Sequence, residues 1–108
     1  MYKLRYTSRV QKYFKKIKEN GLIEAYNKAL DAIESNPYSG QAKTGDLAGV
    51  FCWDIYYNKS NYEIAYHILE IEGSEDERKE RQEYPYVIVI HAGTRENFYQ
   101  ELKRYINP

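Results

Sequence analysis

The side chains best suited to chemistry share one predicted face of two strands in the middle of the chain. Segments 47–57 and 62–71 alternate large apolar and polar residues, which is the two-residue period of a β-strand. One face of the pair is therefore apolar and should pack beneath helices. The opposite face carries nearly all the polar and reactive side chains, namely Cys52, Asp54, Tyr56, Glu63 and His67, together with Ala65.

Several kinds of chemistry are compatible with this face. Asp54 and Glu63 form a carboxylate pair that suits general acid–base catalysis or a hard metal ion. Cys52 near His67 suits a nucleophile with its base, although no third group or oxyanion hole is evident. A sheet face can also be polar simply because water covers it. All three interpretations stay open from the residues alone.

The turn between the two strands sets which side chains face each other. If residues 58–61 form a four-residue turn, Tyr56 lies opposite Glu63 and Cys52 lies opposite His67. Asp54 then lies opposite Ala65. The assignment of faces depends only on the alternation, whereas these pairs depend on the register.

Two further residues follow the apolar run 86–90, which is typical of a central strand covered on both faces. His91 ends this strand just before Gly93, and the end of a rigid strand is a favoured place for functional side chains. A structural histidine is equally compatible. Arg95 falls in the first turn of a helix that Thr94 is expected to cap, where a cation opposes the helix dipole. Its presence there indicates a functional role.

The elements that position these residues predict a small α+β domain. A strand at 2–7 leads into a helix that begins at Ser8, with capping-box spacing to Gln11. Asn20-Gly21 ends this helix, and a second helix ends before Pro37. Residues 36–46 are rich in turn formers, and the charged segment 73–83 predicts a mobile connection. The predicted order is β-α-α-β-β-β-α, a single domain over 1–108 with a four-stranded, antiparallel-rich sheet and a C-terminal helix.

Composition excludes several classes of protein. The 108 residues contain one cysteine and two histidines, which excludes an internal disulfide framework and a cysteine zinc cage. We therefore expect no metal and no cofactor. No apolar run approaches the roughly 18–20 residues of a membrane span, and the start shows no signal-peptide pattern. The expected protein is soluble and cytoplasmic, without a membrane partner.

A formal net charge of zero conceals a strong asymmetry. Residues 1–30 carry eight basic and two acidic side chains, whereas residues 31–92 carry five basic and twelve acidic ones. Arg9, Lys12 and Lys16 lie on the first predicted helix. A basic helix can follow phosphates or bind an acidic partner, and it can also be a solvated face.

Three segments together carry a resemblance to a known family. They are the strand 2–7 with Ser8-Arg9-Val10, the passage from Leu47-Ala48-Gly49 to Tyr62-Glu63-Ile64-Ala65-Tyr66, and the apolar strand that ends in Gly93-Thr94-Arg95 with Tyr99. In order and spacing they resemble the RelE/ParE superfamily of type II toxin–antitoxin toxins. The resemblance covers nearly the whole chain.

This resemblance implies a RelE-like fold and a toxin that a cognate antitoxin holds in check. The leading expectation is a ribosome-dependent mRNA endonuclease, or mRNA interferase, that inhibits growth. It would cleave by metal-free attack of a ribose 2′-hydroxyl on its own phosphate. The alternative is a ParE-type toxin without nuclease activity that binds and inhibits DNA gyrase.

By position, the resemblance gives Arg95 the stabilisation of the transition state. It makes Tyr99 an assisting tyrosine and His91 a possible acid. RelE itself has basic residues where this chain has Asp54, Tyr56 and Glu63. Some related branches use a glutamate base with histidines beside it, a role that Glu63 or Asp54 with His67 would fill.

The basic first hairpin has two expected roles under this resemblance. Arg9, Lys12 and Lys16 would hold RNA phosphates, or they would contact an acidic antitoxin segment.

Overall fold

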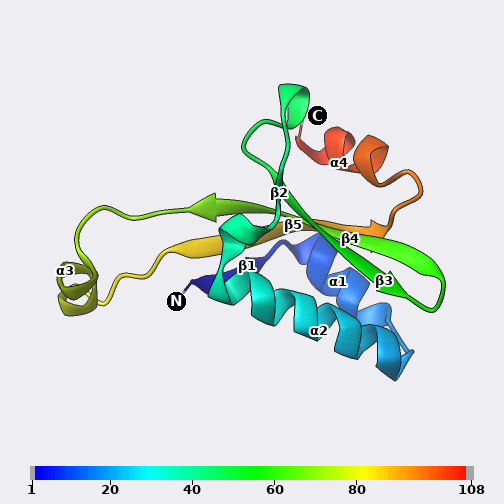
Figure 1. The fold of residues 1–108 in the computed structure, drawn as a ribbon, viewed down its shortest axis with the longest axis horizontal. Coiled ribbons are helices and arrows are strands. Elements are labelled where there is room, and N and C mark those ends of the chain that lie inside the picture. The colour runs from blue at the N-terminus through cyan, green and yellow to red at the C-terminus, as the bar shows by residue number, and fades with distance from the viewer. Residues whose placement is uncertain (1, 107–108) are drawn as a thin grey trace.

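The computed structural model describes residues 2–106 and contains one mixed sheet with helices on both faces (Figure 1). The sheet order is β1-β5-β4-β3-β2, with β1 parallel to β5 and the other pairs antiparallel. In chain order the elements are β1 (Lys3–Tyr6), α1 (Ser8–Lys16), α2 (Asn20–Ser35), η1 (Pro37–Ser39), β2 (Gln41–Ala42), η2 (Gly45–Leu47), β3 (Phe51–Tyr57), β4 (Ser60–Leu69), α3 (Glu75–Glu80), β5 (Tyr86–Thr94) and α4 (Phe98–Ile106).

The α+β class and the order of the main elements are as predicted, but the sheet has five strands and not four. The additional strand, β2, is only two residues long and pairs with Phe51 and Cys52 at the start of β3. It lies in the segment 36–46, whose turn-forming residues predicted a loop. The backbone bond from Lys43 N–H to Val50 C=O extends this pairing by one step.

The register of β3 against β4 differs from the prediction by two residues. Only Asn58 and Lys59 form the turn, both with positive φ (48° and 65°), as in a two-residue hairpin turn. Asp54 therefore lies opposite Glu63, and Cys52 lies opposite Ala65. A shift of two residues keeps every side chain on its face, so the predicted faces are correct although the predicted pairs are wrong.

β5 is longer than predicted, because Gly93 and Thr94 continue the strand beyond the apolar run. The ladder between β4 and β5 shifts between Ala65 and Tyr66, where Ile90 is an extra residue on β5. His91 therefore lies inside the strand and not at its end. Thr94 does not cap the last helix, which begins at Phe98.

The boundaries of the first two helices also differ in detail from the sequence pattern. Thr7, not Ser8, caps α1, because its hydroxyl accepts a hydrogen bond from Val10 N–H at 3.3 Å. α2 begins at Asn20, so the Asn20-Gly21 pair starts the second helix. Gly21 lies against Tyr57, where a Cβ atom would overlap the ring.

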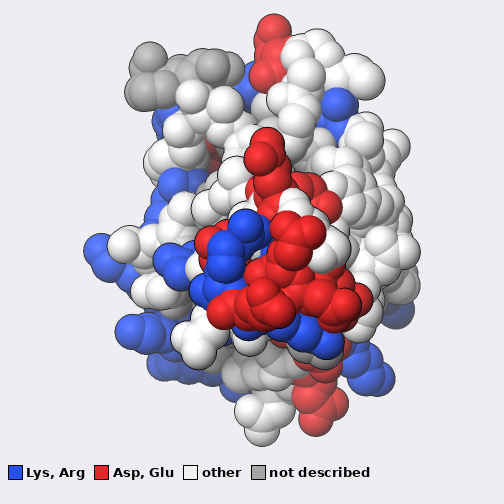
Figure 2. Space-filling model, turned by 90° about the vertical axis from the view of Figure 1, so that its left-hand side faces the viewer, with Lys and Arg blue, Asp and Glu red and all other residues white. Residues whose placement is uncertain are grey.

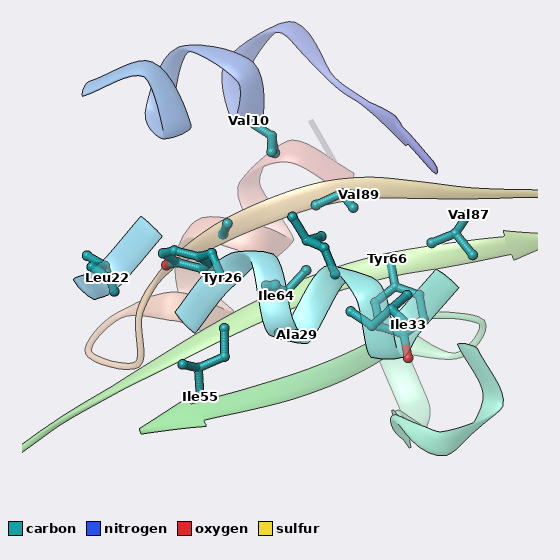
Figure 3. Packing of buried hydrophobic residues seen from close by; sticks show 12 residues of the cluster. Val10, Leu22, Tyr26, Ala29, Ile33, Ile55, Ile64, Tyr66, Val87 and Val89 are labelled. Carbon is teal, nitrogen blue, oxygen red and sulfur yellow. The ribbon is translucent and has the colours of Figure 1, made fainter. Parts of the chain in front are cut away.

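The helical hairpin covers the apolar face of the sheet, as the alternation predicted. Tyr26 and Ile33 of α2 lie over Ile64 and Tyr66 of β4, and Val89 of β5 completes the centre of this core (Figure 3). α4 packs on the opposite face. Its contacts form a second, smaller cluster of Leu47, Val50, Cys52, Ala65, Phe98 and Leu102. The face that the sequence left open to water is therefore partly covered by α4.

The charged connection between β4 and β5 contains the short helix α3, which projects from the sheet at the left of Figure 1. Ser74 caps it by accepting a hydrogen bond from Glu77 N–H, and its first turn is acidic. Acidic side chains gather on this face of the molecule, with basic ones beside them (Figure 2). Within residues 2–106, no helix is both long enough and apolar enough to cross a bilayer.

One buried hydrogen bond joins the sheet to the segment that directly follows α2. The Tyr66 hydroxyl donates to Pro37 C=O at 2.6 Å, and Tyr66 has no exposed surface. Gly40 N–H also donates to this carbonyl, at 3.4 Å. Tyr66→Phe removes the shorter of the two bonds and should lower the free energy of unfolding by about 0.5–1.5 kcal/mol. Urea denaturation measures the effect, and Tyr56→Phe on an exposed ring is the matched control. Equal stability of the two variants would contradict this role of the hydroxyl.

Candidate active site

A buried carboxylate lies at the centre of the sheet. Glu63 of β4 has no exposed surface, although most glutamates in folded proteins face water. Its neighbours in the ladder are Asp54 on β3 and Gly93 on β5. A Cβ atom on Gly93 would meet nothing within 4 Å, so the sheet leaves space on that side of the carboxylate.

Two side chains from the end of β5 and the start of α4 reach this carboxylate. The Tyr99 hydroxyl donates a hydrogen bond to Glu63 Oε2 at 2.7 Å. Arg95 Nε lies 3.2 Å from Oε1 and forms an ion pair, while more than half of the arginine side chain stays exposed. Among the described residues, Oε1 has no hydrogen-bond partner of good geometry. One carboxylate oxygen is therefore satisfied and the other is held only by charge.

The backbone between β5 and α4 explains why Arg95 and Tyr99 meet. Arg95 N–H donates to Asn61 C=O at 2.9 Å, which continues the pairing of β5 with β4 past the strand's end. Asn97 then takes a positive φ of 62°, and the Phe98 N–H donates to Arg95 C=O. This tight turn directs α4 back over the sheet. Tyr99 in its first turn then lies over Glu63.

Burial dominates the electrostatics of the site. It raises the pKa of Glu63, and the charge of Asp54 raises it further. The Tyr99 hydrogen bond and the charges of Arg95 and Lys43 act in the opposite direction without cancelling the effect of burial. Burial and the bond to Glu63 raise the pKa of Tyr99, so the shared proton belongs to the phenol. Glu63 is thus more basic than an exposed glutamate.

Lys43 is a member of the site that the sequence did not indicate. Its ammonium group lies 4.9 Å from the centre of the Tyr99 ring, in a cation–π contact. Lys43 directly follows β2, and the pairing of β2 with β3 brings it to this face. Its position in a turn-rich segment carried no periodic signal, so only the tertiary structure identifies it.

The two histidines do not join Glu63. His91 is buried beside Arg9 and Glu101, with Nε2 3.5 Å from Glu101 Oε2. Burial lowers the pKa of His91, and the Arg9 charge adds to this, against the opposing effect of Glu101. His67 is directed elsewhere, with Nδ1 3.0 Å from Gly49 C=O.

α4 separates the predicted site residues into two groups. Phe98 and Leu102 cover Ala65, which lies between Glu63 and His67 on β4. Glu63, Asp54, Arg95 and Tyr99 lie on one side. His67 lies on the other side, in a cavity of about 270 Å³ that Leu102 and Ile106 also line.

The interpretation of Cys52 as a nucleophile with His67 as its base does not fit the structure. Cys52 lies opposite Ala65 and is buried, and burial raises the pKa of its thiol to about 12. A thiol with such a pKa is protonated at neutral pH and is a poor nucleophile. Within residues 2–106, no group of three His, Cys, Asp or Glu side chains is arranged to hold a metal ion.

The comparisons with known proteins agree with this architecture. A family model described as the ParE-like toxin of type II bacterial toxin–antitoxin systems matches residues 4–103. The chain belongs to this ParE-like toxin family. As a type II toxin it has a cognate antitoxin as its partner. The resemblance predicted from the sequence is thereby confirmed at the level of the family.

A solved structure supports the fold of this toxin. A doubly substituted mutant of the E. coli toxin RelE in its free state matches with a TM-score of 0.63 over 97% of each chain. The two sequences are 20% identical, so this likeness concerns the fold alone. Among curated proteins, no sequence matches that of this toxin significantly.

Arg9 of the toxin is engaged in contacts within the protein. Its guanidinium donates to Ile90 C=O at 2.6 Å, lies 3.3 Å from His91 Nδ1, and stacks over the Tyr105 ring. It therefore joins α1, the bulge in β5 and α4. Lys12 and Lys16 are exposed on α1.

Arg9→Ala should destabilise the toxin by about 1–2 kcal/mol, because it leaves Ile90 C=O unpaired and removes the stacking on Tyr105. Lys12→Ala on the same helix is the control and should be nearly neutral. Thermal and urea unfolding of both variants checks the difference. If both variants were as stable as the wild type, Arg9 would not anchor α4.

The raised pKa of Glu63 predicts a specific dependence of stability on pH. A carboxyl group with a higher pKa in the folded state binds more protons when folded, so its contribution favours folding below its unfolded pKa of about 4.3. That contribution is lost as the pH rises through the folded pKa. Glu63→Gln should therefore be more stable than the wild type at neutral pH, and the difference should shrink towards pH 4.

Urea denaturation of both proteins across this pH range measures the difference. A wild type that loses stability relative to Glu63→Gln as the pH falls would instead show a lowered pKa in the folded state.

Proposed function

We propose that this toxin is a ribosome-dependent mRNA endonuclease with Glu63, Tyr99 and Arg95 as its catalytic residues. The observation that carries the proposal is a buried carboxylate with a raised pKa, held by a phenol on one oxygen and an exposed arginine on the other. This arrangement combines a base, an acid and a cation. Cleavage of RNA by its own 2′-hydroxyl requires these three groups.

In the proposed step, the 2′-oxygen attacks the adjacent phosphorus and the bond to the 5′-oxygen breaks. Glu63 Oε1 accepts the proton of the 2′-hydroxyl. The Tyr99 phenol gives its proton to the departing 5′-oxygen. After the products leave, Oε1 of Glu63 releases its proton to water and the Tyr99 phenolate takes one from water. The products are a 2′,3′-cyclic phosphate and a 5′-hydroxyl, and the protein recovers its starting state.

Arg95 has two consecutive roles in this proposal. In the free toxin it pairs with Oε1 and helps to cover Glu63. Its guanidinium then moves to the non-bridging phosphate oxygens, where two parallel N–H donors stabilise the developing charge. This movement also frees Oε1 to act as the base. Asp54 keeps the carboxylate basic, and Lys43 attracts the RNA backbone to this face.

The remaining predicted residues take supporting roles. His91 lies with Arg9 and Glu101 away from Glu63, so we assign it to the attachment of α4 and not to acid catalysis. Lys12 and Lys16 on α1 would contact ribosomal RNA or an acidic antitoxin segment. His67 has no part in the proposed step.

Primer extension on a reporter message in a cell-free translation reaction tests the proposal. The wild-type toxin should produce new 5′ ends within the reading frame, and none when ribosomes are omitted. Arg95→Ala should reduce the cleavage rate by about 10²-fold or more, and Glu63→Gln by about 10²–10⁴-fold. Tyr99→Phe should also slow cleavage, because it removes the acid.

Arg104→Ala provides the matched control, since it removes an exposed arginine of α4 without touching Glu63. It should cleave at the wild-type rate. Unchanged cleavage by Arg95→Ala or Glu63→Gln would refute the assigned site, even if the wild-type toxin proved to be a nuclease.

The alternative function is inhibition of DNA gyrase by binding, as in ParE-type toxins. Two observations favour it: Glu63 is fully enclosed, and the neighbouring strand presents Asp54 where phosphate would be repelled. This function predicts intact messages together with impaired DNA supercoiling by gyrase. Normal supercoiling at saturating toxin would exclude it.

A further inference from the structure

One edge of the sheet is open over most of its length. β2 pairs only with Phe51 and Cys52, so no strand formed by residues 2–106 lies beside β3 from Trp53 to Tyr57. An exposed strand edge is a template for pairing with another chain unless something blocks it. Asp54 and Tyr56 lie on the face of the sheet opposite α2, and the Tyr56 side chain is 70% exposed.

The hairpin geometry shows which backbone groups face outward. The two-residue turn makes Tyr57 and Ser60 a hydrogen-bonded pair, so alternate residues of β3 bond to β4. Trp53, Ile55 and Tyr57 therefore face β4, whereas the N–H and C=O groups of Asp54 and Tyr56 face away. Within the described part of the chain, these outward groups have no hydrogen-bond partner.

Beneath this edge, α2 provides a surface on which another strand could rest. A groove of about 450 Å³ lies between α2 and β3. On the helix side its lining includes Ala25, Ala29 and Ala32, and on the strand side Trp53 and Ile55. The small side chains of the helix leave room next to the strand. An added strand would thus gain backbone hydrogen bonds and apolar contacts together.

We propose that a second copy of this toxin occupies this edge, with the two β3 strands paired antiparallel about a two-fold axis at Ile55. The result is one continuous sheet across two chains. This inference is independent of the proposed catalytic function. Two-fold symmetry requires that the edge be complementary to itself.

The edge meets this requirement in its side chains. About an axis at Ile55, Asp54 of each copy lies opposite Tyr56 of the other, so the two carboxylates do not face each other. These residues also form the hydrogen-bonded pairs, because their N–H and C=O groups are the outward ones. On the groove side, Trp53 lies opposite Tyr57 of the second copy, an aromatic cross-strand pair of a favourable kind.

The flanking elements are compatible with the same arrangement. Glu24 and Lys28 of α2 both line the groove. In the dimer the α2 helices of the two copies run antiparallel, so Glu24 of one copy faces the side of the other copy that carries Lys28. The end of β2 also sets the length of the open edge. The pairing uses the five residues from Trp53 to Tyr57. The hairpin turn of the second copy then begins next to Gln41, the first residue of β2, which pairs with Cys52.

Sedimentation of the purified toxin from micromolar to millimolar concentration tests for the dimer. Tyr56→Glu places a second carboxylate opposite Asp54 at both symmetric pairs and should weaken dimerisation at least about tenfold. Tyr56→Lys is the matched variant, because lysine opposite Asp54 forms an ion pair and should preserve the dimer. The Tyr56 side chain is exposed, so neither change should disturb the fold.

The double variant Tyr56→Glu with Asp54→Lys reverses both charges of each pair and should restore the dimer. Restoration is specific to the register centred on Ile55. A dimer that Tyr56→Glu and Tyr56→Lys affect equally would overturn that register, and a toxin that stays monomeric at millimolar concentration would overturn the proposal.

Amide hydrogen exchange gives an independent readout on the unaltered chain. The N–H groups of Asp54 and Tyr56 should become protected as the toxin concentration rises, whereas those of Trp53 and Ile55 are protected by β4 at every concentration. Protection of Asp54 and Tyr56 only on addition of the antitoxin would overturn the second copy as occupant and identify the antitoxin instead.

Discussion

The burial of Glu63 is the constraint on which much of the structure depends. A carboxylate without exposed surface is costly unless donors and cations compensate for the lost water. Here the cation is Arg95, which directly follows β5, and the donor is Tyr99 in the first turn of α4. α4 must therefore lie over the open face of the sheet. The second core cluster, with Phe98 over Ala65, follows from that placement.

The opposite end of α4 is fixed by a different set of contacts. Arg9 binds the carbonyl of Ile90, which is accessible because the bulge in the ladder between β4 and β5 falls at this residue. The same guanidinium stacks on Tyr105, and His91 approaches Glu101. α4 is thus held at one end by the candidate catalytic group and at the other by an arginine of α1. A displacement of the helix would disturb both at once.

These features separate what the sequence could predict from what it could not. The faces of β3 and β4 followed from strict alternation, because one face had to carry Trp53 and Ile64 into a core. The register did not follow, since Asn58 and Lys59 both adopt positive φ without a glycine to mark a two-residue turn. The position of Arg95 after the last strand already indicated a functional role, and the family resemblance added Tyr99. Their convergence on Glu63 was not predicted. Lys43 and the contact of Arg9 with Ile90 depend on pairings between distant segments, for which a single sequence carries no local signal.

The chemical identity of residue 63 argues for a function beyond folding. Glutamine at this position could accept the Tyr99 hydrogen bond and offer donors of its own, without the cost of burying a charge. Burial raises the pKa of Glu63. The ionised form of this side chain is therefore less stable in the folded protein than the ionised form of an exposed glutamate. Arg95 compensates only in part, because its side chain is largely in water, where ion pairs contribute little. A group that lowers stability in this way, with one oxygen left without a good donor within residues 2–106, is better explained by the proposed proton transfer than by packing.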